Sequence, residues 1–390
     1  MDMSKRMNNF AKSLSTEDPI DAMTAEFNKI PGMITLTIGE PNFNTPEHIK
    51  KAAIKAIEDN HSHYPDVQGV PALRKATADF MHDKYGLSYD PKTQVLVTLG
   101  VTEAIHAVFA SIINPGDDVI IPTPAYPFYK PNAQAVGAHV VEIDTSKDNF
   151  VLTPQRLEAT LKQYPHAKAL VLNYPNNPVG NVYSKDQLTG LAKVIKKYGI
   201  FCVCDEIYSE LSYDSKHVSM GNIIPDQAIV MNGASKSFAM TGWRIGLVFG
   251  PAPVIRQMNA LNSFFTNGIT TCAQYAAAEG FKNGRDDGLK MRDVYKKRRD
   301  ILRAGLDKAG FTSPEPGGAF YIFAKIPSQF NQNSLQFAKQ LAKEARVGAM
   351  PGSTFGPGGE GHLRFSYATS TDNIRTAVKR IQKFVKYHQK

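Results

Sequence analysis

The stretch Asn232-Gly-Ala-Ser-Lys236-Ser-Phe-Ala-Met-Thr-Gly-Trp-Arg244-Ile-Gly246 joins two apolar runs, Ile229–Met231 and Ile245–Phe249. Both runs are apolar at consecutive positions, which is typical of strands in a sheet that is covered on both faces. A lysine follows the first run among small residues, and an arginine lies eight residues later beside the only tryptophan. A lysine after a strand is most often a solvated loop residue. The neighbouring parts of the chain must therefore decide whether Lys236 has a chemical role.

Similar apolar runs continue on the N-terminal side of this stretch. Five further apolar runs have the length of strands: Val95–Leu99, Val119–Ile121, Val140–Ile143, Ala169–Leu172 and Phe201–Cys204. Helix-length segments such as Lys185–Tyr198 lie between some of them. Thr45 and Pro46 are expected to begin the first helix as its N-cap and its first-turn proline. The alternation of strands and helices predicts a large α/β domain over residues 45–275.

The pattern changes after about Ala276. Two strand candidates, Ala319–Phe323 and His362–Ser366, lie among long charged helical stretches. These stretches are Asp287–Lys308, Ser334–Ala345 and Asp372–Tyr387. We expect a small C-terminal α+β domain over residues 276–390, and an N-terminal segment, residues 1–44, that packs against it. Units of this size are compatible with a chain of 390 residues.

Composition favours a globular protein in the cytoplasm. The net charge of +9 is scattered, and its densest run, Tyr295–Arg299, has a helical pattern that we interpret as a solvated face rather than a nucleic-acid site. No stretch approaches the roughly 20 apolar residues of a membrane span. Cys202 and Cys204 are expected to be small buried residues in a reducing compartment. His61 and His63 have no convincing third ligand, so no metal is expected.

Two candidate ligand groups follow apolar strands. Asp205 and Tyr208 lie in Cys204-Asp-Glu-Ile-Tyr208, at the end of a strand, where ligands bind in open α/β sheets. A buried carboxylate needs a cationic partner, such as a protonated pyridine nitrogen. The second group, Tyr174-Pro-Asn-Asn177-Pro-Val-Gly180, also follows a strand, although taken alone it reads as a prolyl turn.

A third candidate is a phosphate site at a strand-to-helix junction. Gly100-Val101-Thr102-Glu103 follows the strand Val95–Leu99 and is expected to open a helix at Ala104. Free N–H groups and the positive end of a helix bind phosphate well. Arg244 could supply the bidentate charge that a phosphate also favours. The motif is weak alone, because many strand-to-helix turns carry a glycine.

Together these segments resemble the class I aminotransferases of fold type I, from Gly39-Glu-Pro-Asn-Phe43 to Arg364. The lysine stretch with its Gly-Trp-Arg is the most specific part of the match. The resemblance implies a mostly parallel seven-stranded sheet in the large domain and a smaller α+β domain. It also implies pyridoxal 5'-phosphate as cofactor, an amino acid and a 2-oxo acid as substrates, and a homodimer with shared active sites.

The resemblance assigns the cofactor contacts residue by residue. Lys236 would hold the cofactor as a Schiff base and move a proton, and Asp205 would pair with the pyridinium nitrogen. Asn177 and Tyr208 would bond its phenolic oxygen. The remaining contacts would come from Gly100, Val101, Thr102, Tyr126, Ser235 and Arg244, with Tyr64 reaching the neighbouring subunit's phosphate. Gly233 stands where many family members carry a phosphate-binding serine, which leaves the role of Ser235 open.

The substrate contacts follow in the same way. Arg364 matches the arginine that clamps the substrate α-carboxylate as a planar fork, and Gly39 and Asn177 would assist it. The loop Pro351–Gly361 contains five glycines and suits a segment that moves as the site closes.

The sequence gives the weakest indication of which substrate side chain the enzyme accepts. The chain resembles both bacterial aromatic amino acid aminotransferases and N-acetyl-LL-diaminopimelate aminotransferases of lysine synthesis. We expect an aromatic L-amino acid as donor and a 2-oxo acid such as 2-oxoglutarate as acceptor. Aromatic residues expected near the site are Tyr64, Tyr126, Phe128, Phe320 and Tyr321, although the last two could instead fill the small domain's core.

Two other classes are weighed against this one. A carbon–sulfur lyase that uses the same cofactor is the alternative enzyme, and the run Met240–Arg244 favours amino transfer over it. A transcription regulator with an aminotransferase-like sensor would need an additional DNA-binding domain, for which the residues before the first sheet helix leave no room.

Overall fold

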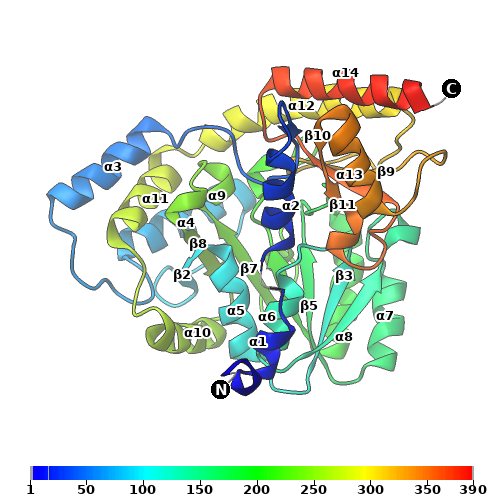
Figure 1. Cartoon of the computed structure of the whole chain (residues 1–390). Coiled ribbons are helices and arrows are strands. Elements are labelled where there is room, and N and C mark those ends of the chain that lie inside the picture. The colour runs from blue at the N-terminus through cyan, green and yellow to red at the C-terminus, as the bar shows by residue number, and fades with distance from the viewer. Residues whose placement is uncertain (1–2, 16, 389–390) are drawn as a thin grey trace.

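The computed structural model describes residues 3–15 and 17–388. Its centre is a seven-stranded sheet in the order β2-β8-β7-β6-β5-β3-β4 (Figure 1). The strands are β2 (Val95–Leu99), β3 (Asp118–Thr123), β4 (His139–Asp144), β5 (Ala167–Asn173), β6 (Phe201–Asp205), β7 (Ala228–Gly233) and β8 (Ile245–Phe249). Neighbouring strands are parallel except at β8, which is antiparallel to both β2 and β7. This confirms the expected mostly parallel sheet of fold type I.

Helices cover both faces of the sheet. Along β6, Cys202 and Cys204 pack into one hydrophobic cluster and Val203 packs into another on the opposite face. The helices on the Cys202 face are α3 (Glu47–Glu58), α4 (Pro71–Tyr85), α7 (Pro154–Gln163), α8 (Lys185–Tyr198) and α11 (Thr271–Asn283). Those on the Val203 face are α5 (Gly100–Ile112), α6 (Tyr129–Ala135) and α10 (Ala252–Phe265). Both cysteines are fully buried, as expected.

A second, smaller sheet has the antiparallel order β11-β12-β9. Its strands are β9 (Tyr321–Lys325), β11 (Met350–Pro351) and β12 (His362–Ser366), and the helices around it are α12 (Asp287–Lys308), α13 (Ser334–Ala345) and α14 (Thr371–His388). Helices α12 and α14 lie side by side (Figure 1). Strands and helices share one core.

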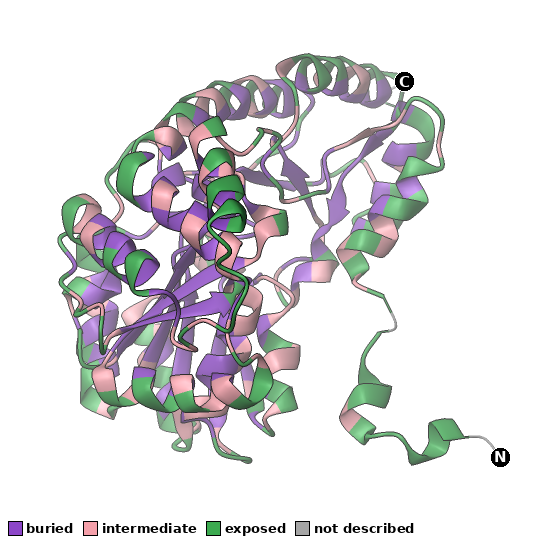
Figure 2. Ribbon diagram, turned by 90° about the vertical axis from the view of Figure 1, so that its left-hand side faces the viewer, coloured by how far each residue is buried: buried purple, intermediate pink, exposed green. Residues whose placement is uncertain are grey.

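The N-terminal segment is tied to this smaller sheet region. Strand β1 (Ile34–Thr35) pairs in parallel with β10 (Val347–Gly348), and Phe27 of α2 (Pro19–Asn28) enters the same core. The short helix α1 (Asn9–Ser13) lies away from the body of the molecule (Figure 2). The remaining helical elements are α9 (Ala234–Ser237) and the 3-10 turns Met3–Arg6, Ser146–Asp148, Ser209–Leu211, Met220–Asn222, Thr241–Trp243 and Gly352–Phe355.

Three expected element boundaries are wrong. Helix α3 begins at Glu47 with Pro46 at its cap, because Thr45 Oγ1 donates to the Ala239 carbonyl instead of capping the helix. Helix α5 begins at Gly100 rather than Ala104, since the Glu103 carboxylate accepts from Leu99 N and closes the first turn. Strand β9 begins two residues late, because Ala319 has a φ of 58°, which a strand cannot accommodate.

The interpretation of Tyr295–Arg299 as a solvated face is also wrong in part. Arg298 and Arg299 are 7% and 4% exposed. The Arg298 guanidinium lies 5.3 Å from the ring centroid of Phe43, and Arg299 pairs with Asp214 at 2.8 Å. The run faces the core on one side because a helix in contact with the protein must bury part of its surface. Among the helices described, none is long and apolar enough to span a membrane.

Candidate active site

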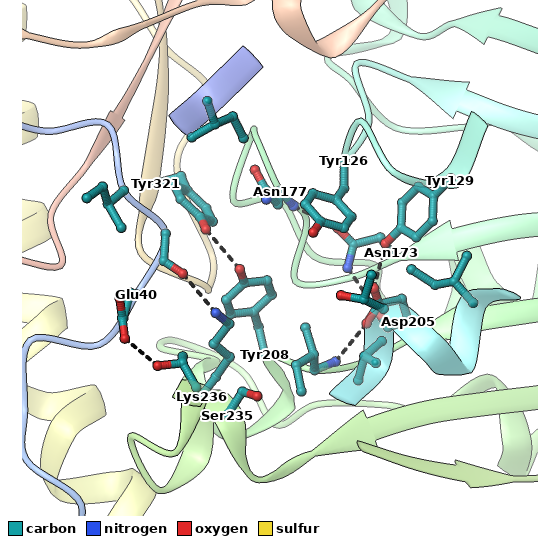
Figure 3. A pocket seen from close by; sticks show the side chains of 18 of the residues that line it. Glu40, Tyr126, Tyr129, Asn173, Asn177, Asp205, Tyr208, Ser235, Lys236 and Tyr321 are labelled. Carbon is teal, nitrogen blue, oxygen red and sulfur yellow. Dashed lines mark hydrogen bonds between the residues drawn. The ribbon is translucent and has the colours of Figure 1, made fainter. Parts of the chain in front are cut away.

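A cavity of about 270 Å³ lies at the carboxyl ends of β5, β6 and β7 (Figure 3). Parallel strands direct the polar residues that follow them to the same sheet edge. The predicted residues that line the cavity are Gly39, Val101, Thr102, Tyr126, Asn177, Asp205, Tyr208, Ser235, Lys236, Arg244 and Arg364. Gly100 lies directly behind this lining, against the Arg244 guanidinium. Tyr64 does not line its own chain's cavity and is 84% exposed.

Lys236 projects into the cavity from α9, the short helix that follows β7. Its Nζ atom donates to the Gly39 carbonyl at 2.8 Å and lies 5.9 Å from the ring centroid of Tyr208. Removal from water lowers the pKa of Lys236 to about 8, although the carboxylate of Glu40 opposes this shift. An amine with such a pKa is partly unprotonated near neutral pH, so it can attack a carbonyl carbon.

Asp205, the last residue of β6, is a buried carboxylate that faces the same cavity. Tyr129 OH donates to its Oδ2 at 2.6 Å, and Ile207 N donates to its Oδ1 at 3.2 Å. Burial raises the pKa of Asp205 to about 6, against the effect of these hydrogen bonds and of Lys236. No lysine, arginine or histidine among the described residues forms an ion pair with Asp205. The carboxylate therefore suits a ligand that brings its own cation.

An anion site is built where β2 meets α5. Val101 and Thr102 present the first turn of α5 to the cavity, and Arg244 approaches from the start of β8. Gly100 has a φ of 74°, and a Cβ at this position would overlap the Arg244 guanidinium. Arg244 Nη1 donates a hydrogen bond to the Thr241 carbonyl at 2.9 Å. Helix N–H groups and a guanidinium together suit a phosphate group.

Arg364 enters the cavity from β12 on the opposite side. It is 1% exposed, and its Nη1 donates to Asn177 Oδ1 at 2.8 Å while Nη2 donates to the Thr37 carbonyl. Its guanidinium stacks 4.5 Å from the ring centroid of Tyr321. Within the described residues its buried Nε has no hydrogen-bond partner. A buried, oriented guanidinium with an unused donor suits a carboxylate ligand.

Three further residues line the cavity beside Lys236: Tyr208, Tyr321 and Gly39. Tyr208 OH and Tyr321 OH lie 2.9 Å apart, and burial raises the pKa of Tyr208 well above its usual value, so its phenol stays protonated. At Gly39 a Cβ would collide with the Tyr321 hydroxyl, so a larger residue would force the Tyr321 side chain to move.

The sequence reasoning missed about half of the cavity lining. The missed residues are Asp18, Ile20, Asp21, Ile38, Glu40, Ile105, Tyr129, Asn173, Ile207 and Thr241. Tyr129 lies three residues after Tyr126 and Asn173 ends an apolar strand, so both stood within recognised segments. Asp18 and Asp21 had no signal, because only the path of the N-terminal segment brings them to the cavity.

The pieces of the site match the parts of pyridoxal phosphate: an amine for its aldehyde, a buried carboxylate for its ring nitrogen and a helix terminus with an arginine for its phosphate. Fold and site together define a pyridoxal-phosphate-dependent transferase of fold type I. The chain matches the family model described as aminotransferase class I and II over residues 31–381, and it belongs to that family.

Named relatives agree with this assignment. The chain is 41% identical to a probable N-acetyl-LL-diaminopimelate aminotransferase of Bacillus subtilis over 90% of this chain and 89% of the relative. It is 39% identical to the aspartate/prephenate aminotransferase of Thermus thermophilus, over 89% and 90% of the two chains. The structure of an aromatic aminotransferase from Pyrococcus horikoshii superposes with a TM-score of 0.88, at 34% identity over 94% and 99% of the two chains. The protein is a pyridoxal-phosphate-dependent aminotransferase, and its relatives differ in substrate.

Proposed function

We propose that the protein transfers the amino group of an aromatic L-amino acid to a 2-oxo acid such as 2-oxoglutarate. The observation that carries this proposal is the cavity in which Lys236, Asp205 and Arg364 converge beside Tyr321. When bound, the cofactor supplies an electron sink for negative charge at the substrate α-carbon. The Nζ atom of Lys236 moves the proton from that carbon, and its pKa of about 8 suits an amine that must gain and lose a proton.

The remaining roles on the cofactor side are proposed from the same geometry. Asp205 holds the ring nitrogen, Tyr126 stacks on the ring, and Asn177 and Tyr208 bond the phenolic oxygen. The phosphate is held by Gly100, Val101, Thr102, Ser235 and Arg244. These roles are supported by the position of the residues: all of them line the cavity except Gly100, which lies behind the lining against the Arg244 guanidinium.

On the substrate side, Arg364 binds the α-carboxylate with help from Asn177 and the backbone of Gly39. We expect Arg364→Lys to raise the KM for amino acid and 2-oxo acid by about ten- to a hundredfold, because an ammonium keeps the charge but loses the bidentate geometry. Steady-state kinetics with both substrates would measure this effect. Lys325→Arg, an exposed change on the neighbouring strand, serves as the control. Unchanged KM values in Arg364→Lys would contradict the assignment.

The charge of the cavity supports a neutral side chain on the donor. The three cations in its lining, Lys236, Arg244 and Arg364, all have roles at the cofactor or the α-carboxylate. The other charged groups that line the wall, apart from Asp205, are Asp18, Asp21 and Glu40. Carboxylates would repel a second carboxylate on the donor. The distal carboxylate of an acceptor such as 2-oxoglutarate therefore needs a hydroxyl or backbone contact, or a residue of a second subunit.

The aromatic residues near the site divide into two groups. Tyr126 and Tyr321 line the cavity, whereas Phe128 does not. Phe320 is fully buried in the core of the smaller sheet, where it packs against Tyr295, and its ring centroid lies 5.8 Å from Lys236 Nζ. The alternative function is that of an N-acetyl-LL-diaminopimelate aminotransferase, which the 41% identical relative favours.

A panel of amino donors with 2-oxoglutarate as acceptor tests the substrate proposal. We expect the kcat/KM for phenylalanine or tyrosine to exceed those for aspartate, alanine and N-acetyl-diaminopimelate, because aromatic contacts add about 0.5–1.5 kcal/mol to apolar burial. The initial rate of glutamate formation measures each value. If aspartate or N-acetyl-diaminopimelate were better than both aromatic donors by about tenfold, roughly 1.4 kcal/mol of transition-state preference, the aromatic proposal would be wrong.

We also propose a homodimer with shared sites, in which Tyr64 reaches the partner's phosphate site. Tyr64 and Phe264 are 84% and 87% exposed, so both side chains are accessible to a second subunit. A monomer in sedimentation velocity at micromolar concentration would contradict this.

The free cysteines suit a cytoplasmic location, which cell fractionation can test.

A further inference from the structure

A buried polar cluster lies on the face of the sheet that points away from Asp205. Glu206, next to Asp205 in sequence, is 0% exposed. Its Oε1 accepts from Tyr174 OH at 2.9 Å and from Ser219 Oγ at 2.8 Å, and its Oε2 lies 2.8 Å from His217 Nε2. The His217 ring stacks on Tyr174 with centroids 5.3 Å apart. We refer to these four residues as the Glu206 cluster; none of them lines the cavity.

The cluster is joined to the active site through the backbone of Tyr174. Tyr174 N donates to the Asp205 carbonyl at 3.2 Å, and Asn173 Nδ2 donates to the same oxygen at 2.9 Å. Asn173 Oδ1 in turn accepts from Asn177 N at 2.8 Å. The ends of β5 and β6 are thus fastened to each other directly beside the groups proposed to contact the cofactor.

The side-chain hydroxyl of Tyr174 is also fixed by hydrogen bonds, on the side of the sheet that faces Glu206. It donates to Glu206 and accepts from Met220 N at 2.9 Å, so both of its bonding directions are used. Burial and the Glu206 carboxylate raise the pKa of Tyr174 well above its usual value, which keeps the phenol protonated as a donor. Directional bonds of this kind fix one orientation of a side chain, whereas apolar packing would allow several.

We propose that Glu206 is a positioning residue for amino transfer: through Tyr174 it sets the placement of Asp205 and Asn177 around the cofactor ring. The inference rests on the proposed function of those two residues. Burying a carboxylate is unfavourable unless its bonds are satisfied, and the three donors around Glu206 meet that need. At metal sites, residues that orient the metal ligands change affinity or activity by about 10- to 100-fold when replaced, and we expect an effect at the lower end of that range here.

The test compares Tyr174→Phe and Glu206→Gln with the wild type in the full-length protein. Tyr174→Phe keeps the ring and its stacking but removes the donor. We expect about a tenfold lower kcat, and a shift of the pH midpoint of the visible absorbance of the protein–cofactor complex. Glu206→Gln keeps an oxygen for Tyr174, so its effects are expected to be smaller. Ser219→Ala, which removes only one donor, provides a milder change if Tyr174→Phe does not fold.

The sheet offers a control at its opposite end. Asp118, at the amino end of β3, is 6% exposed and lies 2.6 Å from His139 Nδ1. Asp118→Asn therefore alters a carboxylate–histidine pair far along the strand direction from the cavity, although the His139 side chain is 61% exposed and that of His217 only 2%. It should lower the melting temperature and leave kcat and the absorbance titration unchanged.

The outcomes separate the two proposals. If the cluster variants fold and change only the melting temperature, as Asp118→Asn does, the positioning role is overturned and the cluster is structural. If wild-type protein binds pyridoxal phosphate and transaminates while the variants show shifted titrations, the role is supported. A wild type that fails to transaminate any donor would instead overturn the proposed function itself.

Discussion

Replacing Lys236 with alanine is expected to abolish transamination, with kcat reduced by about 10⁴-fold or more. The reason is that the variant loses both the amine that attaches the cofactor and the group proposed to move the substrate proton. The variant should still bind pyridoxal phosphate non-covalently, because the anion site around Arg244 and Gly100 is unchanged. Turnover with phenylalanine and 2-oxoglutarate, and mass spectrometry after borohydride reduction, measure the two losses separately.

Lys236→Arg is the matched variant for this experiment. A guanidinium preserves the positive charge and can donate to the Gly39 carbonyl, as Lys236 does at 2.8 Å. It does not lose its proton in proteins, however, so it cannot attack the cofactor or act as a base. It should therefore be as inactive as Lys236→Ala. Wild-type turnover in either purified variant would show that another residue carries the chemistry.

Asp205→Asn is expected to lower kcat by about 10²- to 10³-fold, with much smaller changes in KM. An asparagine has the same shape and keeps one oxygen to accept from Tyr129 OH, but its amide nitrogen cannot accept from Ile207 N as the second carboxylate oxygen does. It supplies no negative charge to keep a ring nitrogen protonated, and the proposed electron sink becomes weaker. Steady-state kinetics measures the effect, and a variant with undiminished kcat would contradict the role of Asp205.

Although Asp205→Asn is expected to lower activity, it should raise the stability of the cofactor-free protein near neutral pH. The pKa of Asp205 is raised by burial from 3.8 to about 6 in the folded protein. The unfolded chain thus ionises this group at lower pH than the folded one, and the folded state is penalised as pH rises through this window. Above pH 6 the whole penalty is present, on the order of 2 to 3 kcal/mol.

Removing the charge should consequently stabilise the cofactor-free protein at pH 7 but not at pH 3.5. Thermal unfolding of the wild type and Asp205→Asn at the two pH values measures the difference. Tyr129→Phe, which removes one of the two hydrogen bonds to the carboxylate, should shift stability the other way at pH 7. A cofactor-free Asp205→Asn that is less stable than the wild type at pH 7 would contradict the proposed cost of burying this charge.

The sequence predicts the central sheet because each of its strands is a short run of apolar residues. The runs Val95–Leu99 and Ile245–Phe249 coincide with β2 and β8, and the other five lie inside observed strands. Element starts were predicted less well, since they depend on individual backbone torsions and side-chain bonds. The φ of Ala319 and the bond of Thr45 to Ala239 are examples that no apolar pattern encodes.

The candidate site was predicted wherever a residue belongs to a compact motif. Lys236 with Arg244, and Asp205 with Tyr208, lie in such motifs and line the cavity together. The acidic wall formed by Asp18 and its neighbours could not be found in this way, because its residues belong to a segment that reaches the cavity only through the tertiary fold. The burial of Arg298 could not be predicted for a similar reason. The sequence of a charged helix shows which residues are polar, but not which side of the helix contacts another element.

The pairing of β1 with β10 fastens one side of the site to the smaller sheet, whereas the other side is built on the larger sheet. The segment that carries Gly39 is fastened to the smaller sheet, because Leu36 N donates to the Gly348 carbonyl and Ser366 N donates to the Leu36 carbonyl. Arg364 also belongs to the smaller sheet. Lys236 follows a strand of the larger sheet and donates one hydrogen bond to the carbonyl of Gly39 on the other side of the site. A hinge motion between the two sheets would change the width of the gap around a substrate, and it would have to stretch the hydrogen bonds that cross the gap, from Arg364 to Asn177 and between Tyr208 and Tyr321.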